Sequence, residues 1–156
     1  MLSNKNLVET FFQSMGRGDF RTLNACYSHD IIYSDPIFGL LKGDDVRMMW
    51  QMLLEGAKDI SVKILEIEDV DEEYITCRYS ISYFFEPTGR TISNLPKAFM
   101  RIKDEKIIEH SDGYRLSTFI ANAYGLKGQV LGWSGFMKKS VQRRYRNLLT
   151  QFINMF

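Results

Sequence analysis

The pattern of apolar and polar positions changes about a third of the way along the chain. Up to residue 57, apolar side chains recur at helical spacing, strongest over residues 6–15 and 43–57. A shorter helix is predicted over residues 20–27. A short strand is predicted over residues 31–39, broken at Asp35-Pro36 because proline cannot donate to a strand ladder.

From residue 60 the pattern becomes that of strands. The strand-length runs are residues 60–70, 72–85, 90–103 and 106–116, and turn residues separate them. The short connections favour an antiparallel meander. Helices followed by such a sheet predict an α+β fold in which the helices cover one face.

The last part of the sequence reads as a helical extension. Residues 117–126 resemble a helix, and a basic amphipathic helix runs to the end after a glycine-spaced segment. Five basic residues crowd the beginning of this last helix: Lys138, Lys139, Arg143, Arg144 and Arg146. We expect the helix to pack on the body with its cations solvated. A membrane surface or an anionic partner is the alternative. The predicted division is a pocket domain at residues 1–116 and a helical extension at 117–156, on or beside it.

Composition narrows the class of protein. The length of 156 residues, with 45% hydrophobic and 25% charged residues, fits one globular domain. A net charge of +1 gives no case for a nucleic-acid partner. Cys26 and Cys77 read as free thiols in a reducing cytosol, with a disulfide as the alternative. Without a signal-peptide pattern or an apolar run of ~18 residues, the sequence predicts a cytoplasmic protein.

One short segment carries candidate chemistry. In "KIIEHSDGY", residues 106–114, His110 and Asp112 are two positions apart on a predicted strand, so their side chains share a face. If this face lines an apolar pocket, lost hydration should raise the pKa of the aspartate toward the range useful for proton transfer. If it faces water, both are ordinary surface residues.

A second carboxylate, Asp35, lies in the apolar stretch "IIYSDPIFGLL". It could serve a pocket, or it could bond the backbone in an Asp-Pro turn. Asn94 could orient a carbonyl group or cap a strand end, and Tyr33, Tyr79 and Tyr114 could be hydrogen-bond donors or core residues. The sequence has no phosphate-binding glycine loop, no HExxH motif and no GxSxG motif, and its two isolated histidines do not suggest a metal site. We therefore expect no cofactor and no metal.

The sequence also resembles a known superfamily. It is similar to the nuclear-transport-factor-2-like proteins, and most similar to the SnoaL-type polyketide cyclases and the ketosteroid-isomerase-related proteins. The resemblance lies in the order helix–"GRGDF"–helix–"YSDPIFG"–helix, followed by four strands that end in "KIIEHSDGY". The resemblance runs from about residue 7 to 116. It implies a cone-shaped curved sheet, antiparallel or mixed, wrapped by the N-terminal helices around a deep apolar pocket. It also implies a homodimer formed through the sheet.

Residue by residue, the resemblance is partial. Asp35 is similar to the general base of the ketosteroid isomerases, but their oxyanion-hole positions fall near Phe11 and Ala98 here. Asp112 is similar in placement to the second aspartate of limonene-epoxide-hydrolase-like enzymes. Their arginine and first aspartate fall near Tyr79 and Ile81, so epoxide opening is disfavoured. The cyclases fit better, since they use one acid/base aspartate in the last strand with a histidine nearby, as Asp112 and His110 would be.

These observations give a leading hypothesis and an alternative. The leading one is a cofactor-free acid/base enzyme of the cyclase or isomerase type, acting on a small hydrophobic carbonyl compound. Asp112 would be the acid/base, His110 would orient it and Asp35 would be a second carboxylate. The expected pocket lining is Tyr33, Trp50, Tyr79, Asn94 and Tyr114. The alternative is a non-catalytic module of the same fold that binds a small hydrophobic ligand, a protein or a membrane.

Overall fold

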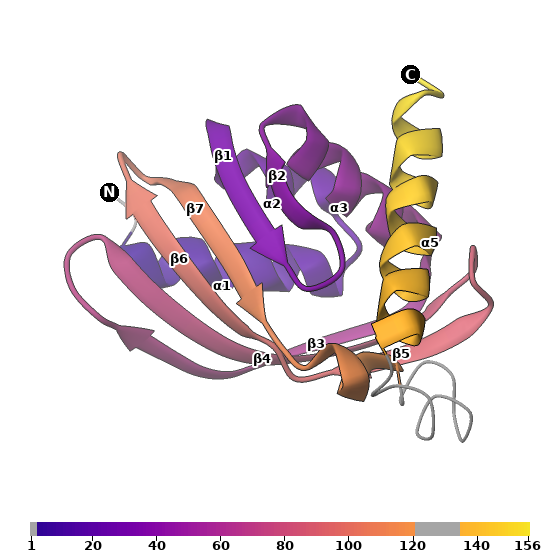
Figure 1. The fold of residues 1–156 in the computed structure, drawn as a ribbon. Helices are drawn as coiled ribbons and strands as arrows, with labels where there is room; N and C mark the ends of the chain where they lie inside the picture. Colours follow the sequence, from indigo (N-terminus) through magenta and orange to yellow (C-terminus); the bar gives the residue numbers. More distant parts are fainter. Residues whose placement is uncertain (1–2, 121–134) are drawn as a thin grey trace.

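The computed structural model describes residues 3–120 and 135–156 (Figure 1). The helices with assigned bounds are α1 (Asn4–Gly16), α2 (Phe20–Ala25), α3 (Asp44–Gly56) and α5 (Gly135–Ile153). The strands are β1 (Tyr27–Asp35), β2 (Gly39–Lys42), β3 (Ala57–Asp69), β4 (Tyr74–Phe85), β5 (Arg90–Asn94), β6 (Lys97–Lys103) and β7 (Lys106–Gly113). The predicted helix at 117–126 is helical over residues 116–120, and its remainder lies outside the described residues.

The strands form one curved, mixed sheet with its N-terminal helices on the concave side (Figure 1). The order is β2-β1-β7-β6-β4-β3, and β5 pairs with β4 beyond the end of β6. The four-strand meander is therefore extended, because β1 joins β7 in parallel. The predicted α+β class and cone-like curvature are confirmed.

Two predicted elements differ in their bounds. The run 90–103 is two strands, β5 and β6, which pair with the two halves of β4 on either side of Pro96. The helix expected over 20–27 ends at Ala25, and Tyr27 instead begins β1. The backbone N–H of Ile107 donates to the carbonyl of Cys26, so pairing with β7 overrides the helical pattern here.

The strand register fixes which side chains face the helices. Tyr33, His110, Met100 and Ile75 form one cross-strand row, and all four are buried. The neighbouring row on the opposite face is Ser34, Ser111, Phe99 and Thr76. His110 and Asp112 thus share the concave face, and Glu109 and Ser111 share the other, as the strand pattern predicts.

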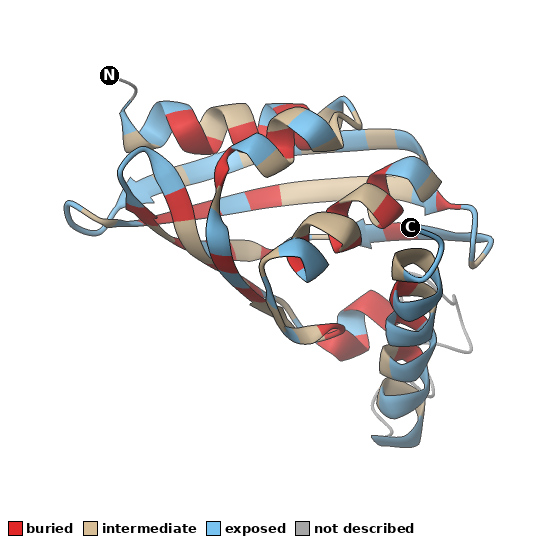
Figure 2. Ribbon diagram, turned by 90° about the horizontal axis from the view of Figure 1, so that it is seen from above, coloured by how far each residue is buried: buried red, intermediate tan, exposed pale blue. Residues whose placement is uncertain are grey.

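The core fills the space between the concave face and the helices, where Figure 2 shows most of the buried positions. Ser3 caps the N-terminus of helix α1, and its side chain accepts a hydrogen bond from the Asn6 N–H. The inward stripe of α1 includes Phe11 and Phe12, which are almost fully buried. Cys26 and Cys77 are both buried free thiols.

Helix α5 packs against the body and contributes Val141, Tyr145 and Leu149 to the same core. Arg144 donates to the Pro87 carbonyl at 3.3 Å, and Arg146 donates to the Ile37 carbonyl at 3.1 Å. Part of the basic cluster therefore holds the helix in place. An anionic partner for the remaining basic residues, Lys138, Lys139 and Arg143, stays a prediction. Among the described residues, no helix combines the length and apolar character needed to cross a membrane.

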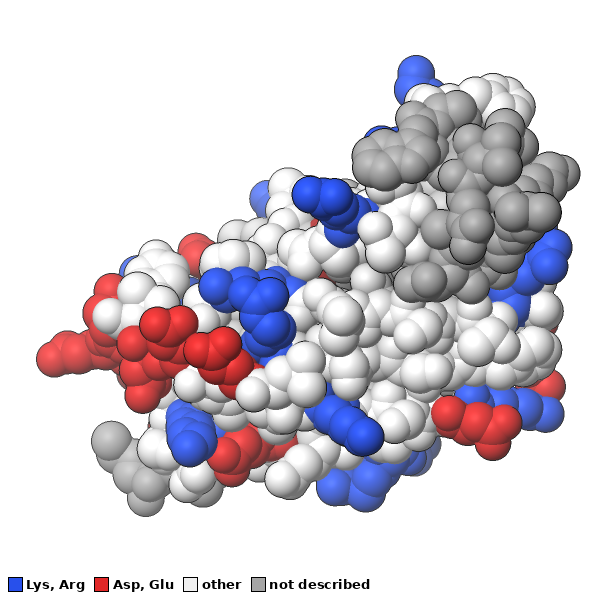
Figure 3. Space-filling view, turned by 90° about the horizontal axis from the view of Figure 1, so that it is seen from below, with Lys and Arg blue, Asp and Glu red and all other residues white. Residues whose placement is uncertain are grey.

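The outer face of the sheet has a centre without charged side chains (Figure 3), and several of its exposed residues are apolar or aromatic. Ile32, Tyr74 and Phe99 lie on this face with exposed fractions of 40, 41 and 49%. Charged side chains of both signs flank them. Arg101 forms an ion pair with Glu73 at 2.7 Å and lies 3.6 Å from Glu109. Acidic side chains gather at the end of this face near the β3–β4 turn (Figure 3).

Candidate functional site

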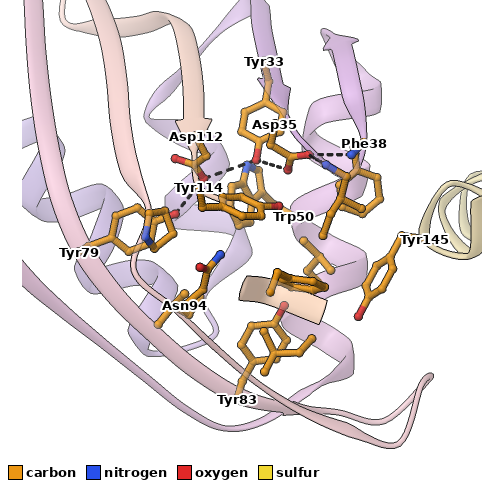
Figure 4. Close-up of a pocket in the computed structure, with 16 residues that line it drawn as sticks. Tyr33, Asp35, Phe38, Trp50, Tyr79, Tyr83, Asn94, Asp112, Tyr114 and Tyr145 are labelled. Atoms are coloured by element: carbon orange, nitrogen blue, oxygen red, sulfur yellow. Dashed lines mark hydrogen bonds between the residues drawn. The ribbon is translucent and has the colours of Figure 1, made fainter. Parts of the chain in front are cut away.

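A cavity of about 60 Å³ lies between the concave face of the sheet, α3 and α5 (Figure 4). Most of the residues predicted for a pocket line it: Tyr33, Asp35, Trp50, Tyr79, Asn94, Asp112 and Tyr114. His110 does not line the cavity and instead lies behind Asp112. Typical small-molecule pockets are roughly 300–1,000 Å³, so this one suits a small ligand.

Three side chains hold the carboxyl group of Asp112 in the cavity wall. The Asp112 side chain is 4% exposed. His110 Nε2 lies 2.8 Å from its Oδ1, and the Tyr79 hydroxyl donates to Oδ2 at 2.8 Å. The Tyr33 hydroxyl is a longer contact to the same Oδ2 at 3.5 Å. These partners hold the carboxyl group in one orientation at the cavity wall (Figure 4).

His110 is oriented from behind by a chain of buried hydrogen bonds. Trp50 Nε1 donates to the Tyr27 hydroxyl at 2.9 Å, and this hydroxyl lies 2.7 Å from His110 Nδ1. An indole nitrogen is only a donor, so the hydroxyl proton of Tyr27 is available for Nδ1. The network assigns Nδ1 as the acceptor and places the imidazole proton on Nε2, where it donates to Asp112.

Tyr27 is the site residue that sequence reasoning missed. The pattern of 20–27 placed it at the end of a helix, whereas it begins β1 and points inward with 4% exposure. No local sequence pattern identifies Tyr27 as a site residue, because it reaches His110 only through the pairing of Tyr27 with Ile107 in the folded protein. Only the parallel contact between β1 and β7 reveals it.

Asp35 satisfies both readings that the sequence left open. Its Oδ1 accepts the backbone N–H groups of Ile37 at 2.8 Å and Phe38 at 2.6 Å, as in a local Asp-Pro turn. Its Oδ2 accepts the Tyr33 hydroxyl at 2.6 Å on the cavity side. Burial raises the pKa of Asp35 above its usual value, and the nearby Asp112 adds to the rise, although the hydrogen bonds oppose it.

A raised pKa for Asp35 predicts a pH-dependent stability. The folded protein holds this proton more tightly than the unfolded chain does, whose carboxyl has a pKa near 3.8. The stability that Asp35 contributes is therefore present below that value and is lost as pH rises through the folded pKa. We expect Asp35→Asn to gain stability relative to the wild type between pH 4 and pH 7. Urea unfolding at both pH values measures this, and a constant difference would contradict it.

The phenol groups around the carboxylates act as hydrogen-bond donors. Burial raises the pKa of Tyr33, Tyr79 and Tyr114 well above the usual phenol value. They therefore keep their protons at neutral pH and can donate to a carboxylate or to a ligand oxygen. Asn94 accepts the backbone N–H of Leu95 at 3.0 Å through its side-chain oxygen, so it caps the end of β5 while lining the cavity.

Aromatic rings pack around the imidazole and keep it from water. The ring of Phe11 meets His110 edge-on at 5.4 Å, and Trp50 lies parallel to it at 6.5 Å. The oxyanion-hole tyrosine of the ketosteroid isomerases is expected near Phe11, and this side chain has no polar group. Ala98, near which the second such position is expected, is the register partner of Asp112. Within the part of the chain that the structure describes, no three His, Cys, Asp or Glu residues gather as a metal site would require.

Comparisons with known proteins identify related sequences and folds. A family model described as a SnoaL-like domain matches residues 8–110, so it ends just before Asp112 and excludes α5. The comparison with curated proteins gives no match.

Solved structures share the fold. One is a hypothetical protein with a ketosteroid isomerase-like fold from Catenulispora acidiphila, in complex with trimethylamine (TM-score 0.68, 16% identity, 85% of this chain and 99% of that chain). A proposed polyketide cyclase from Pseudomonas putida has a TM-score of 0.65 and 16% identity, over 79% of this chain and 99% of its own. An LEH-like epoxide hydrolase from M. tuberculosis has a TM-score of 0.65 and 18% identity, over 80% of this chain and 90% of its own. At these identities the likeness concerns the fold alone.

Proposed function

Since the chain belongs to the SnoaL-like domain family, we propose that it is a cofactor-free acid/base enzyme of the cyclase or isomerase type. Its substrate would be a small hydrophobic carbonyl compound. The observation that carries the proposal is Asp112, a carboxyl group in the wall of an apolar cavity with a histidine behind it. A positioned base of this kind contributes typically about 10²–10⁴-fold to a proton-transfer rate.

The reaction would begin with Asp112 taking the proton from the carbon next to the substrate carbonyl. The electron pair of the broken C–H bond passes into the carbonyl and gives an enolate. In the isomerisation of a β,γ-unsaturated carbonyl compound, the enolate is a dienolate, and Asp112 returns the proton to its γ carbon while the double bond moves into conjugation with the carbonyl. In a cyclisation, the enolate carbon attacks a second carbonyl of the substrate, and the proton goes to the new alkoxide.

The remaining polar groups have supporting roles in this proposal. His110 donates to Oδ1 of Asp112 and so directs Oδ2 toward the substrate side. Tyr33 lies between the two carboxylates, 2.6 Å from Oδ2 of Asp35 and 3.5 Å from Oδ2 of Asp112 (Figure 4). The Tyr33 hydroxyl donates to Oδ2 of Asp35, which holds the phenol group beside Asp112. When a substrate is bound, this hydroxyl could turn to donate to an enolate oxygen, which would replace in part the missing oxyanion donors.

Exchange of carbon-bound hydrogen for deuterium tests the proposal whatever the product of the reaction is, because it follows the first proton transfer alone. The protein is incubated in D₂O with a panel of small ketones and aldehydes, and exchange next to the carbonyl is followed by proton NMR. We expect protein-dependent exchange for at least one compound. No exchange above buffer for any of them, together with saturable binding of the same compounds, would instead favour the non-catalytic binding module.

We also propose that the chain forms a homodimer through the outer face of the sheet. The apolar centre at Ile32, Tyr74 and Phe99 is flanked by both Arg101 and Glu109, so the face can complement a copy of itself about a two-fold axis. Sedimentation should give a dimer for the wild type and a monomer for Phe99→Glu. Val70→Glu, exposed in the β3–β4 turn, is the control and should remain dimeric. A wild-type monomer would contradict the proposal.

A further inference from the structure

Helix α5 contacts the turn that follows Asp35 through three of its side chains. Gln142 Nε2 donates to the Pro36 carbonyl at 2.9 Å, and Arg146 Nε donates to the Ile37 carbonyl at 3.1 Å. The ring of Tyr145 meets the ring of Phe38 edge-on at 6.1 Å. Three successive residues of the turn, 36–38, are thus each held by α5.

The same turn carries the backbone donors of Asp35. The N–H groups of Ile37 and Phe38 both point to Asp35 Oδ1, while the carbonyl of Ile37 points to Arg146. The two peptide units whose carbonyls accept from α5 are therefore the same two whose N–H groups orient the carboxylate. Movement of α5 would release the turn and, with it, the hydrogen bonds that set the direction of Asp35.

The approach of Arg146 depends on a glycine at the end of this turn. Gly39 has a φ of +68°, in the region that favours glycine, and a Cβ added there would lie 3.1 Å from Nη2 of Arg146. A larger residue at position 39 would strain the backbone at this φ and would require the guanidinium of Arg146 to shift by a few tenths of an ångström. The turn and the helix fit each other closely at this point.

Helix α5 also forms one wall of the cavity. Tyr145 is 1% exposed and lines the cavity, and it lies on the side opposite Asp112 in Figure 4. Phe119, from the helical residues 116–120, packs against it at 6.0 Å. With both rings in place, the cavity has about 60 Å³ of free volume.

From these contacts we propose that α5, which lies outside the family match, is a positioning and specificity element of the site. Gln142 and Arg146 position Asp35 by holding the 36–38 turn, and Tyr145 limits the size of the carbonyl compound that the cavity admits. The size limit deepens the proposed function and rests on it. The positioning of Asp35 is measurable without any turnover.

The first test measures the pKa of Asp35 by ¹³C NMR of its side-chain carboxyl. The hydrogen bonds from Ile37 and Phe38 lower this pKa, so their loosening should raise it. We expect the double substitution Gln142→Ala with Arg146→Ala to raise the pKa of Asp35 above the wild-type value. Arg143→Ala, an exposed position on the same helix, should leave it at that value and serves as the matched control. An equal pKa in the double variant and the control would overturn the positioning role.

The second test enlarges the cavity with Tyr145→Ala. We expect the ratio of deuterium exchange for a bulky ketone to that for a small one to rise by about tenfold or more. An unchanged ratio in a folded variant would overturn the size limit. If Tyr145→Ala does not fold, Tyr145→Leu is used instead, because leucine retains more apolar volume. The same exchange ratio then tests the size limit. A wild type without exchange activity would contradict the proposed function, and the Asp35 result would still decide the positioning role.

Discussion

Asp112→Asn should lower the rate of substrate deuterium exchange by about 10²–10⁴-fold, because the amide cannot accept the substrate proton. The substitution keeps the shape of the side chain and an oxygen that can still accept the His110 Nε2 proton. Folding should therefore be preserved while the base is lost. The measurement is the proton NMR exchange assay with the most responsive compound of the panel.

Glu109→Gln is the matched control for the loss of Asp112. Glu109 lies on the same strand, β7, but points to the outer face with a side chain 46% exposed. We expect this variant to exchange at the wild-type rate. If Asp112→Asn also keeps that rate, Asp112 is not the base, and the proposed mechanism is wrong.

Phe11→Ala should destabilise the protein by about 3–5 kcal/mol, the typical cost of truncating a fully buried phenylalanine. Phe11 is 0% exposed and touches the rings of Phe12, Tyr27, Trp50 and His110. The loss would leave a void beside the imidazole that rigid neighbours cannot fill. The measurement is the free energy of unfolding from a denaturant titration.

Phe136→Ala provides the comparison for Phe11→Ala, because Phe136 is 83% exposed on α5. Its truncation should change the free energy of unfolding by no more than about 0.5 kcal/mol. A loss of less than about 1 kcal/mol in Phe11→Ala would mean that the rings around His110 are loosely packed. The dry environment assumed for the carboxylates would then be unsupported.

Local patterns were sufficient to predict much of the fold. The helices α1 and α3 follow from their apolar stripes, and the strand runs follow from alternation and turn residues. The shared face of His110 and Asp112 follows from the two-residue period of a strand. These features depend on residues close in sequence, so the sequence alone predicts them.

The features that the sequence did not predict depend on contacts between distant segments. Tyr27 was assigned to a helix because the parallel pairing of β1 with β7 leaves no local signal. The double role of Asp35 requires both the local turn and the proximity of Asp112. The hydrogen bonds from α5 to the 36–38 turn join residues more than a hundred positions apart. An amphipathic sequence pattern predicts that a helix packs against the body, but it does not predict which segment the helix contacts.

The measurement that tests the central claim most directly is a ¹⁵N NMR spectrum of the two histidine side chains near neutral pH. The account holds that an imidazole, fixed by Tyr27, donates to a carboxylate in the wall of a dry cavity. It predicts that His110 shows a single tautomer with an acceptor Nδ1 and a protonated Nε2, while the exposed His29 shows the averaged signals of an imidazole in water. Averaged signals for His110 as well would contradict the account, since they would place its ring in contact with solvent.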